Sequence, residues 1–227
     1  MIPRSLLLSS IGICAVSAVS SVFAEPFEIK SGDRILMMGD TLLEREGSSA
    51  ALEHRLMSSL PMTPFTVRNL SFSADQPNGV SRASFGAANT GLDRIKEELD
   101  LVKPTVAIIG YGMAASLEQM TYASGDPNLN PDVTRYGNDF SPQSFKANLL
   151  NLMDMINASN GGQPVRFVLL APLRHEDLRA TRPGLPDPAA HNAILEEYVK
   201  VIQQVATERG ATFIDVAPRL QIKGTSP

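Results

Sequence analysis

Apolar runs of strand length alternate with amphipathic segments along most of this chain. The apolar runs predict five strands, at Arg34–Met38, Phe65–Leu70, Thr105–Ile109, Val165–Leu170 and Ala211–Asp215. Between them, apolar residues at helical spacing predict helices at Ser48–Leu60, Gly91–Leu101, Gln143–Asn157 and Pro188–Arg209. This alternation predicts an α/β domain in which a doubly wound, five-stranded parallel sheet lies between two layers of helices, an αβα sandwich.

Two segments follow neither pattern. Residues 118–142 contain Pro127, Pro131 and Pro142 among several Gly, Asn and Asp residues, and they predict a long loop. His175–Pro188 predicts a second irregular stretch. Long loops in compact domains are usually functional or mobile, so both segments are expected near a site.

The carboxyl ends of the predicted strands bring distant segments to one edge of the sheet, which we call the rim. These ends are Gly39–Thr41, Ser71–Asp75, Gly110–Ser116, Ala171–Asp177 and Asp215. Ligands of open parallel sheets bind beyond this edge. Gly39–Thr41 also forms the turn before a predicted helix, which would present the hydroxyl of Thr41 to a substrate as a candidate nucleophile.

The N-terminus has the features of a secretion signal. One basic residue, Arg4, precedes the uncharged segment Leu6–Val22, and Ala24 ends a small-residue cleavage pattern. We therefore expect a signal peptide at residues 1–24, a single domain at 25–227, export to the periplasm or beyond, and no stable membrane anchor after cleavage. The full chain has a net charge of −4 and no basic stripe, which argues against a nucleic-acid partner.

Four blocks in order resemble those of the SGNH (GDSL-type) hydrolase superfamily. They are Ile35–Thr41, Val67–Asp75, Val106–Met113 and Val168–Pro172. The further patterns Gly39–Arg45, His175–Leu178 and Pro186–Asn192 resemble a secreted, planctomycete-type branch. The resemblance implies a flavodoxin-like SGNH fold and a hydrolase acting on ester (acyl) bonds. It also implies a small-molecule or glycan ester as substrate, drawn from carbohydrates or lipids, and no cofactor.

The resemblance also implies roles for individual residues. Thr41 stands at the position of the nucleophilic serine, and its backbone N–H and that of Ala74 would hold the oxyanion. Ala114 falls where the superfamily has an asparagine, so its side chain supplies no donor. Asp40 and Asp75 are expected as pocket residues on the rim. The methyl group of Thr41 restricts the rotation of its hydroxyl.

The position of the general base departs from the superfamily pattern. In the superfamily a histidine follows the last strand with an aspartate three residues before it, whereas no histidine follows Asp215 here. A truncated or degenerate enzyme is therefore expected. Among the three histidines, His175 on the rim and His191 near Asp187 are candidate bases, while His54 is expected in a solvated helix.

Two functions remain open on the sequence. The first is an exported ester hydrolase with Thr41 as nucleophile, and the second is a non-catalytic module that binds a glycan or acyl ligand. No metal site is predicted, because no spacing of His, Cys, Asp and Glu matches a coordination shell. Asn138–Asp139 has the composition of the missing asparagine block but lies in the predicted loop rather than at a strand end, so it is not the favoured replacement donor. Glu44–Arg45 is expected as the solvated start of a helix rather than part of the pocket.

Overall fold

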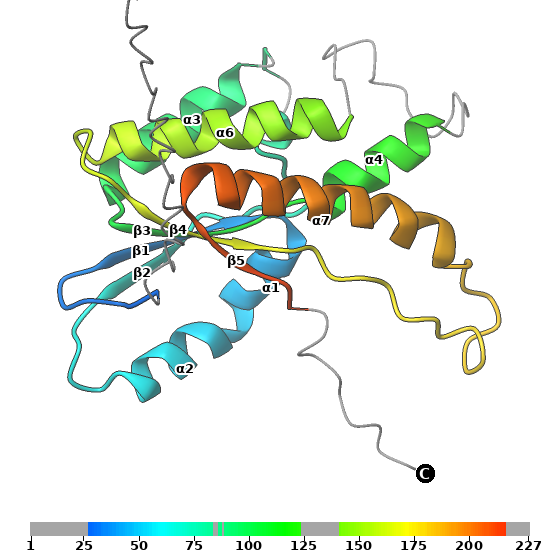
Figure 1. Cartoon of the computed structure of the whole chain (residues 1–227), viewed down its shortest axis with the longest axis horizontal. Helices are drawn as coiled ribbons and strands as arrows, with labels where there is room; N and C mark the ends of the chain where they lie inside the picture. The colour runs from blue at the N-terminus through cyan, green and yellow to red at the C-terminus, as the bar shows by residue number, and fades with distance from the viewer. Residues whose placement is uncertain (1–26, 84–85, 88, 124–140, 217–227) are drawn as a thin grey trace, which may run out of the picture.

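The computed structural model describes residues 27–83, 86–87, 89–123 and 141–216 (Figure 1). In these residues the strands form one five-stranded parallel sheet with the order β2-β1-β3-β4-β5. The strands are β1 Arg34–Gly39, β2 Thr66–Asn69, β3 Val106–Gly110, β4 Arg166–Leu170 and β5 Thr212–Ile214. This is the flavodoxin-like order, with its switch point between β1 and β3, so the predicted fold is confirmed.

Helices cover both faces of the sheet. Figure 1 shows α1 (Thr41–Ser49) and α2 (Ala51–Ser59) on one side, with α3 (Thr90–Val102), α6 (Pro142–Ser159) and α7 (Ala189–Arg209) on the other. The helix α4 (Met113–Ala123) and the short 3-10 helix η1 (Val80–Arg82) follow the carboxyl ends of β3 and β2. The result is a three-layer sandwich.

The core divides into two clusters because side chains alternate across a strand. Leu36 and Ala107 join the cluster beneath α3, α6 and α7. Their neighbours Ile35 and Ile108 join the smaller cluster on the α1 face. The two central strands are therefore apolar at successive positions, which explains the uninterrupted runs in the sequence.

Two predicted boundaries were wrong. The helix predicted from Ser48 to Leu60 begins earlier, at Thr41, and is divided by Ala50, whose φ of 50° ends α1 and starts α2. The loop predicted over 118–142 was wrong for residues 118–123, which belong to α4, and residues 124–140 lie outside the described residues. The prolines that follow α4 led us to extend the predicted loop back over residues that favour a helix. Asn138–Asp139, the predicted signal peptide and the tail after residue 216 lie outside the described residues.

Candidate active site

The turn after β1 depends on a close approach between two strands. Gly39 pairs with Gly110 of β3, and a Cβ atom at Gly39 would lie 2.3 Å from the Gly110 carbonyl oxygen. Only glycine fits this position, because the contact involves backbone that cannot move aside. Strands β1 and β3 then diverge at the rim, where β1 leads into α1 and β3 leads into α4.

The buried carboxylate of Asp40 accepts hydrogen bonds from the first turns of both helices, α1 and α4. Its Oδ1 accepts a hydrogen bond from Leu42 N (3.5 Å), which caps α1. Its Oδ2 accepts from Met113 N (3.0 Å) and Ala114 N (3.3 Å) at the start of α4. Burial raises the pKa of Asp40 to about 6, against these three N–H donors, and the negative charge of Asp75 adds to the increase.

Thr41 is the first residue of α1, and its side chain is exposed. Its Oγ1 accepts a hydrogen bond from Ala74 N at 3.2 Å, so the N–H predicted as an oxyanion donor lies next to the predicted nucleophile. Ala74 holds this position with a φ of 57°, in the left-handed region that favours glycine. The N–H of Thr41 belongs to the first helical turn, where N–H groups have no intrahelical partner.

Ala114 contributes to the site only through its backbone. Its N–H donates to Asp40, and the residue is buried, with 7% of its surface exposed. An alanine side chain has no donor to offer an oxyanion. The third donor implied by the family resemblance is therefore missing from this position.

Thr41 lies on a cavity of about 260 Å³ between the carboxyl ends of β1, β3 and β4. We call this space the rim cavity. Its walls are largely apolar, and it is lined by Asp40, Thr41, Leu42, Arg45, Gly110, Tyr111, Met113, Ala171, Pro172 and Leu173. Arg45 thus lines the cavity, whereas the sequence favoured a purely solvated role for it.

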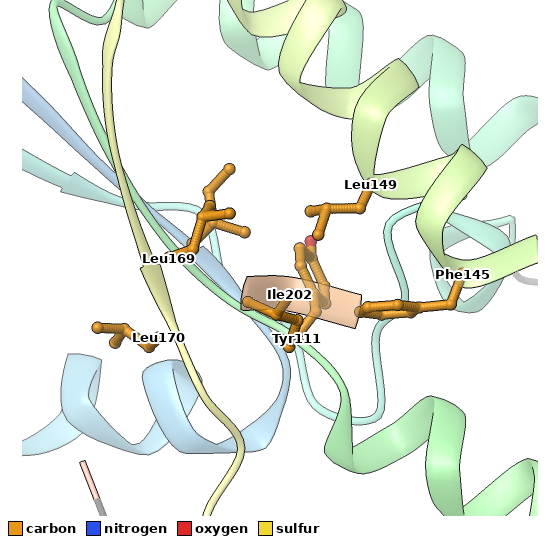
Figure 2. A pocket seen from close by; sticks show the side chains of 7 residues that line it. Tyr111, Phe145, Leu149, Leu169, Leu170 and Ile202 are labelled. Atoms are coloured by element: carbon orange, nitrogen blue, oxygen red, sulfur yellow. The ribbon is translucent and has the colours of Figure 1, made fainter. Parts of the chain in front are cut away.

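A second gap lies beneath the rim cavity, and Tyr111 borders both. Figure 2 shows its apolar lining, with Phe145 and Leu149 of α6 and Ile202 of α7 facing Leu169 of β4. The gap has no space for a water-sized molecule, so it is a packing defect of the core rather than a binding site.

Asp75 does not line the rim cavity, although it was predicted as a pocket residue. It is fully buried, and its Oδ2 accepts from Arg82 Nε (2.9 Å) and from the Tyr111 hydroxyl (3.0 Å). Arg82 also contacts Glu98 and the Leu70 carbonyl. Burial raises the pKa of Asp75 while the guanidinium of Arg82 opposes the increase. The carboxylate turns inward because η1 brings Arg82 beneath it, and the pair anchors the turn that carries Ala74.

The two candidate bases belong to a separate group of side chains. His191 Nε2 lies 2.8 Å from Ser116 Oγ, and His191 Nδ1 lies 2.7 Å from His175 Nε2. This is the order of a nucleophile, a base and an orienting group. However, Ser116 is 0% exposed, and its hydroxyl donates to the Met113 carbonyl (2.8 Å). A substrate therefore has no access to this serine.

The structure thus places the sequence-predicted residues in two groups. Asp40 and Thr41 line the rim cavity, with Ala74 hydrogen-bonded to Thr41, while His191 joins Ser116 to His175. Within the described residues, neither histidine forms a hydrogen bond with Thr41. Ser116 was missed from the sequence, although it lies in a rim segment and its hydroxyl could have been paired there with a histidine.

Two further properties concern only the described part of the chain. In it, no three His, Cys, Asp or Glu side chains come together as a metal site would require. None of its helices has the length and apolar character needed to cross a bilayer.

Comparisons with known proteins give matches in three dimensions only. No family model matches the chain, and no curated protein matches it significantly. Among solved structures, a catalytic mutant of an acetylxylan esterase from Geobacillus stearothermophilus is similar, with a TM-score of 0.59 and 17% identity over 85% of this chain and 80% of its own. An α/β hydrolase from the metagenome of Lake Arreo, Spain, has a TM-score of 0.54 and 16% identity over 83% of this chain and 79% of its own.

The chain has the fold of the SGNH-type esterases. A third similar structure is a gut microbial diltiazem-metabolizing enzyme, with a TM-score of 0.52 and 15% identity, of which 39% is covered. At these identities the likeness extends to the fold, and the activity of this chain has to be argued from its own residues.

Proposed function

We propose that this protein hydrolyses small esters at the rim cavity, with the Thr41 hydroxyl as nucleophile. The observation that carries the proposal is the pairing of Thr41 Oγ1 with Ala74 N at 3.2 Å, on the wall of a cavity that solvent reaches. A hydroxyl beside a backbone N–H donor suits acyl transfer, because a carbonyl attacked by Thr41 Oγ1 would bring its oxygen within reach of the Ala74 N–H.

The reaction would run in two steps. Thr41 Oγ1 bonds to the carbonyl carbon, the ester C–O bond breaks, and the alcohol leaves with a proton. Water then attacks the carbonyl carbon of the acyl-threonine, and the bond between that carbon and Thr41 Oγ1 breaks. The OH of the water leaves in the carboxylic acid, and its other proton restores the Thr41 hydroxyl. Within the described residues no imidazole or carboxylate is hydrogen-bonded to Thr41, so solvent accepts the first proton and we expect slow turnover.

The cavity favours a short acyl group. Its volume of about 260 Å³ and its apolar walls suit a small acyl chain with the alcohol part left outside. The structural neighbours include acetylxylan esterases. We therefore propose acetyl esters of carbohydrates as the first substrate class, with export by a signal peptide at residues 1–24 giving access to extracellular polysaccharides.

A second function, binding of the same ligand without hydrolysis, is favoured by two observations. The Ala114 side chain has no donor where an asparagine is expected, and both candidate bases are engaged by Ser116 or by each other. Loss of one oxyanion donor typically lowers the rate by about 10²–10³. A protein with the cavity but neither group would retain the ligand and not cleave it.

Hydrolysis of p-nitrophenyl acetate by the full chain separates the two functions. We expect slow hydrolysis by the wild type, none above buffer in Thr41→Ala, and unchanged hydrolysis in Thr207→Ala, an exposed threonine on α7. Equal rates from the wild type and Thr41→Ala would reject Thr41 as nucleophile. Binding of acetylated xylo-oligosaccharide by calorimetry without hydrolysis would establish the second function.

A gain of activity provides a stronger test of the oxyanion geometry. Ala114→Asn restores a side-chain amide at the family position, and we expect about a tenfold or larger increase in kcat. Ala114→Leu, which has a similar size and no donor, serves as the matched control. Equal rates from the two variants would show that this position faces away from the acyl oxygen.

A further inference from the structure

The histidines His175 and His191 have no part in the proposed reaction, yet they form a continuous hydrogen-bonded chain. The chain runs from Ser116 in α4 through His191 at the start of α7 to His175, in the segment after β4. The two rings have centroids 4.8 Å apart. This group joins α4 to the start of α7 and to the segment that precedes α7, and we call it the histidine clamp.

The hydrogen bonds of the clamp have a defined direction. Because the Ser116 hydroxyl donates to the Met113 carbonyl, its oxygen accepts from the Nε2–H of His191. A neutral His191 then carries no hydrogen on Nδ1, which accepts from the Nε2–H of His175. A second proton on His191 would set two N–H groups against each other and break the link to His175.

The backbone of His175 is held as firmly as its ring. Its N–H donates to Asn192 Oδ1 (2.8 Å), and its carbonyl accepts from Asn192 Nδ2 (2.9 Å). The preceding Arg174 is bonded to Glu196 of α7 and to Asp215 after β5. The segment after β4 is thereby fixed to the first turns of α7.

The clamp connects two walls of the rim cavity. Ala171, Pro172 and Leu173 form one wall and end two residues before His175. Met113 lies on the other side of the clamp and also lines the cavity, and its carbonyl is the acceptor of Ser116. Movement of His175 away from His191 would therefore widen the cavity at Leu173.

We propose that Ser116, His191, His175 and Asn192 are positioning residues that hold these cavity walls together only while His191 is neutral. This proposal rests on the proposed function only for the identity of the ligand that the rim cavity accepts. The clamp itself is a statement about the described residues and can be tested without any substrate.

Two features of the surroundings oppose the protonation of His191. Burial lowers the pKa of His191, and the electrostatic interaction with the neighbouring His175 ring lowers it further. Among the charged side chains of the neighbouring segments, Arg174 pairs with Glu196 and Asp215, and Arg179 pairs with Asp177 and Asp187. Glu118 of α4 is hydrogen-bonded to Gln76, and Glu176, next to His175, is exposed.

The direction of the pH effect follows from this lowered pKa. The folded protein binds the proton of His191 less readily than the unfolded chain, whose histidine has a pKa near 6.5. The clamp therefore contributes its full stability above pH 6.5 and loses it as the pH falls through the lower pKa of the folded state.

Two measurements on the full chain decide the proposal. In nitrogen-15 histidine spectra at pH 8, we expect both His175 and His191 to carry their hydrogen on Nε2, with His54→Gln removing the third histidine signal. Amide exchange at His175, whose N–H donates to Asn192, should rise about tenfold or more in Asn192→Ala and in wild type at pH 5, after correction for the intrinsic pH dependence. Asn151→Ala, at an exposed position of α6, should leave it unchanged.

A hydrogen on Nδ1 of His191, or equal protection of the His175 amide at pH 5 and pH 8, would overturn the proposal. If the wild type hydrolyses p-nitrophenyl acetate, Asn192→Ala should raise KM severalfold with a smaller change in kcat, because the cavity wall moves and the nucleophile does not. If the wild type hydrolyses nothing, the proposed function fails, and the spectra and exchange rates still decide the clamp.

Discussion

Thr41 and Ser116 carry the same functional group in opposite environments. Thr41 is exposed, lines a cavity and has a backbone N–H at 3.2 Å, but no imidazole is bonded to it in the described residues. Ser116 has an imidazole at 2.8 Å with a second imidazole behind it, but it has no exposed surface. Each region holds the half of a hydrolytic site that the other lacks.

The difference shows that a hydroxyl–imidazole–imidazole order is insufficient evidence for a nucleophile. The Ser116 hydroxyl donates to the Met113 carbonyl, and in the proposed clamp His191 is therefore a donor to the serine rather than a base. Substrate access to the hydroxyl and the direction of each hydrogen bond distinguish a structural hydrogen-bond chain from a catalytic one. In our proposal, Ser116, His191 and His175 instead hold the walls of the rim cavity in place.

The largest effect is expected from breaking the buried ion pair beneath the Thr41 region. Asp75→Ala removes the fully buried carboxylate that pairs with Arg82, which is itself 8% exposed, and should lower the free energy of unfolding by about 3–5 kcal/mol. Urea denaturation of the wild type and the variant measures this difference in unfolding free energy. The surface pair of Asp154 with Arg209 is the control, and Asp154→Ala should cost less than about 1 kcal/mol. Equal costs would show that the Ala74 turn does not depend on the pair.

The next effect tests the charge on Asp40. Its pKa of about 6 is raised above the ordinary value of 3.8, so its stabilising contribution is complete below pH 3.8 and is lost as the pH rises through 6. Asp40→Asn removes this titration. Relative to the wild type, the variant should gain on the order of 3 kcal/mol in unfolding free energy between pH 4 and pH 7. A difference that stays constant with pH would contradict the raised pKa.

A smaller effect separates the two hydroxyls directly. Ser116→Ala removes the acceptor of the buried Nε2–H of His191 and should cost about 1–3 kcal/mol in unfolding free energy. Ser58→Ala, at an exposed serine whose hydroxyl also donates to a helix carbonyl, should cost less than about 0.5 kcal/mol. A fluorophosphonate adduct mapped to the Ser116 peptide of the wild type would break the comparison, because a fully buried serine should not react.

The smallest effect concerns the turn that offers the oxyanion donor. Ala74→Gly relieves a φ of 57° and should raise the unfolding free energy by less than about 1 kcal/mol, since the unfolded chain also gains freedom. Ala50→Gly, at a φ of 50° between α1 and α2, should give a similar gain by the same thermal denaturation measurement. A loss of stability in Ala74→Gly alone would mean that its methyl group has a packing role.

Much of the fold could be predicted from the chain, and the site only in part. Alternation of apolar runs and amphipathic segments was sufficient for five parallel strands, because burial on both faces leaves a direct trace in the sequence. It also brought Thr41 and Ala74 to one rim. It did not reveal α4, and it placed Asp75 in the pocket, because the choice between cavity and core depends on Arg82, which reaches the carboxylate from the next turn.

The sequence by itself determined the layers of this protein and the edge of the sheet where its chemistry-bearing residues collect. The tertiary structure decided which of those residues meet, since a hydrogen bond depends on positions within a few tenths of an ångström that strand periodicity does not specify. It set Thr41 against Ala74 at a cavity and joined His191 to Ser116 inside the protein. The imidazoles of His175 and His191 are separated from the exposed Thr41 hydroxyl by the packing of α4 against α7. No pattern along the sequence specifies that packing.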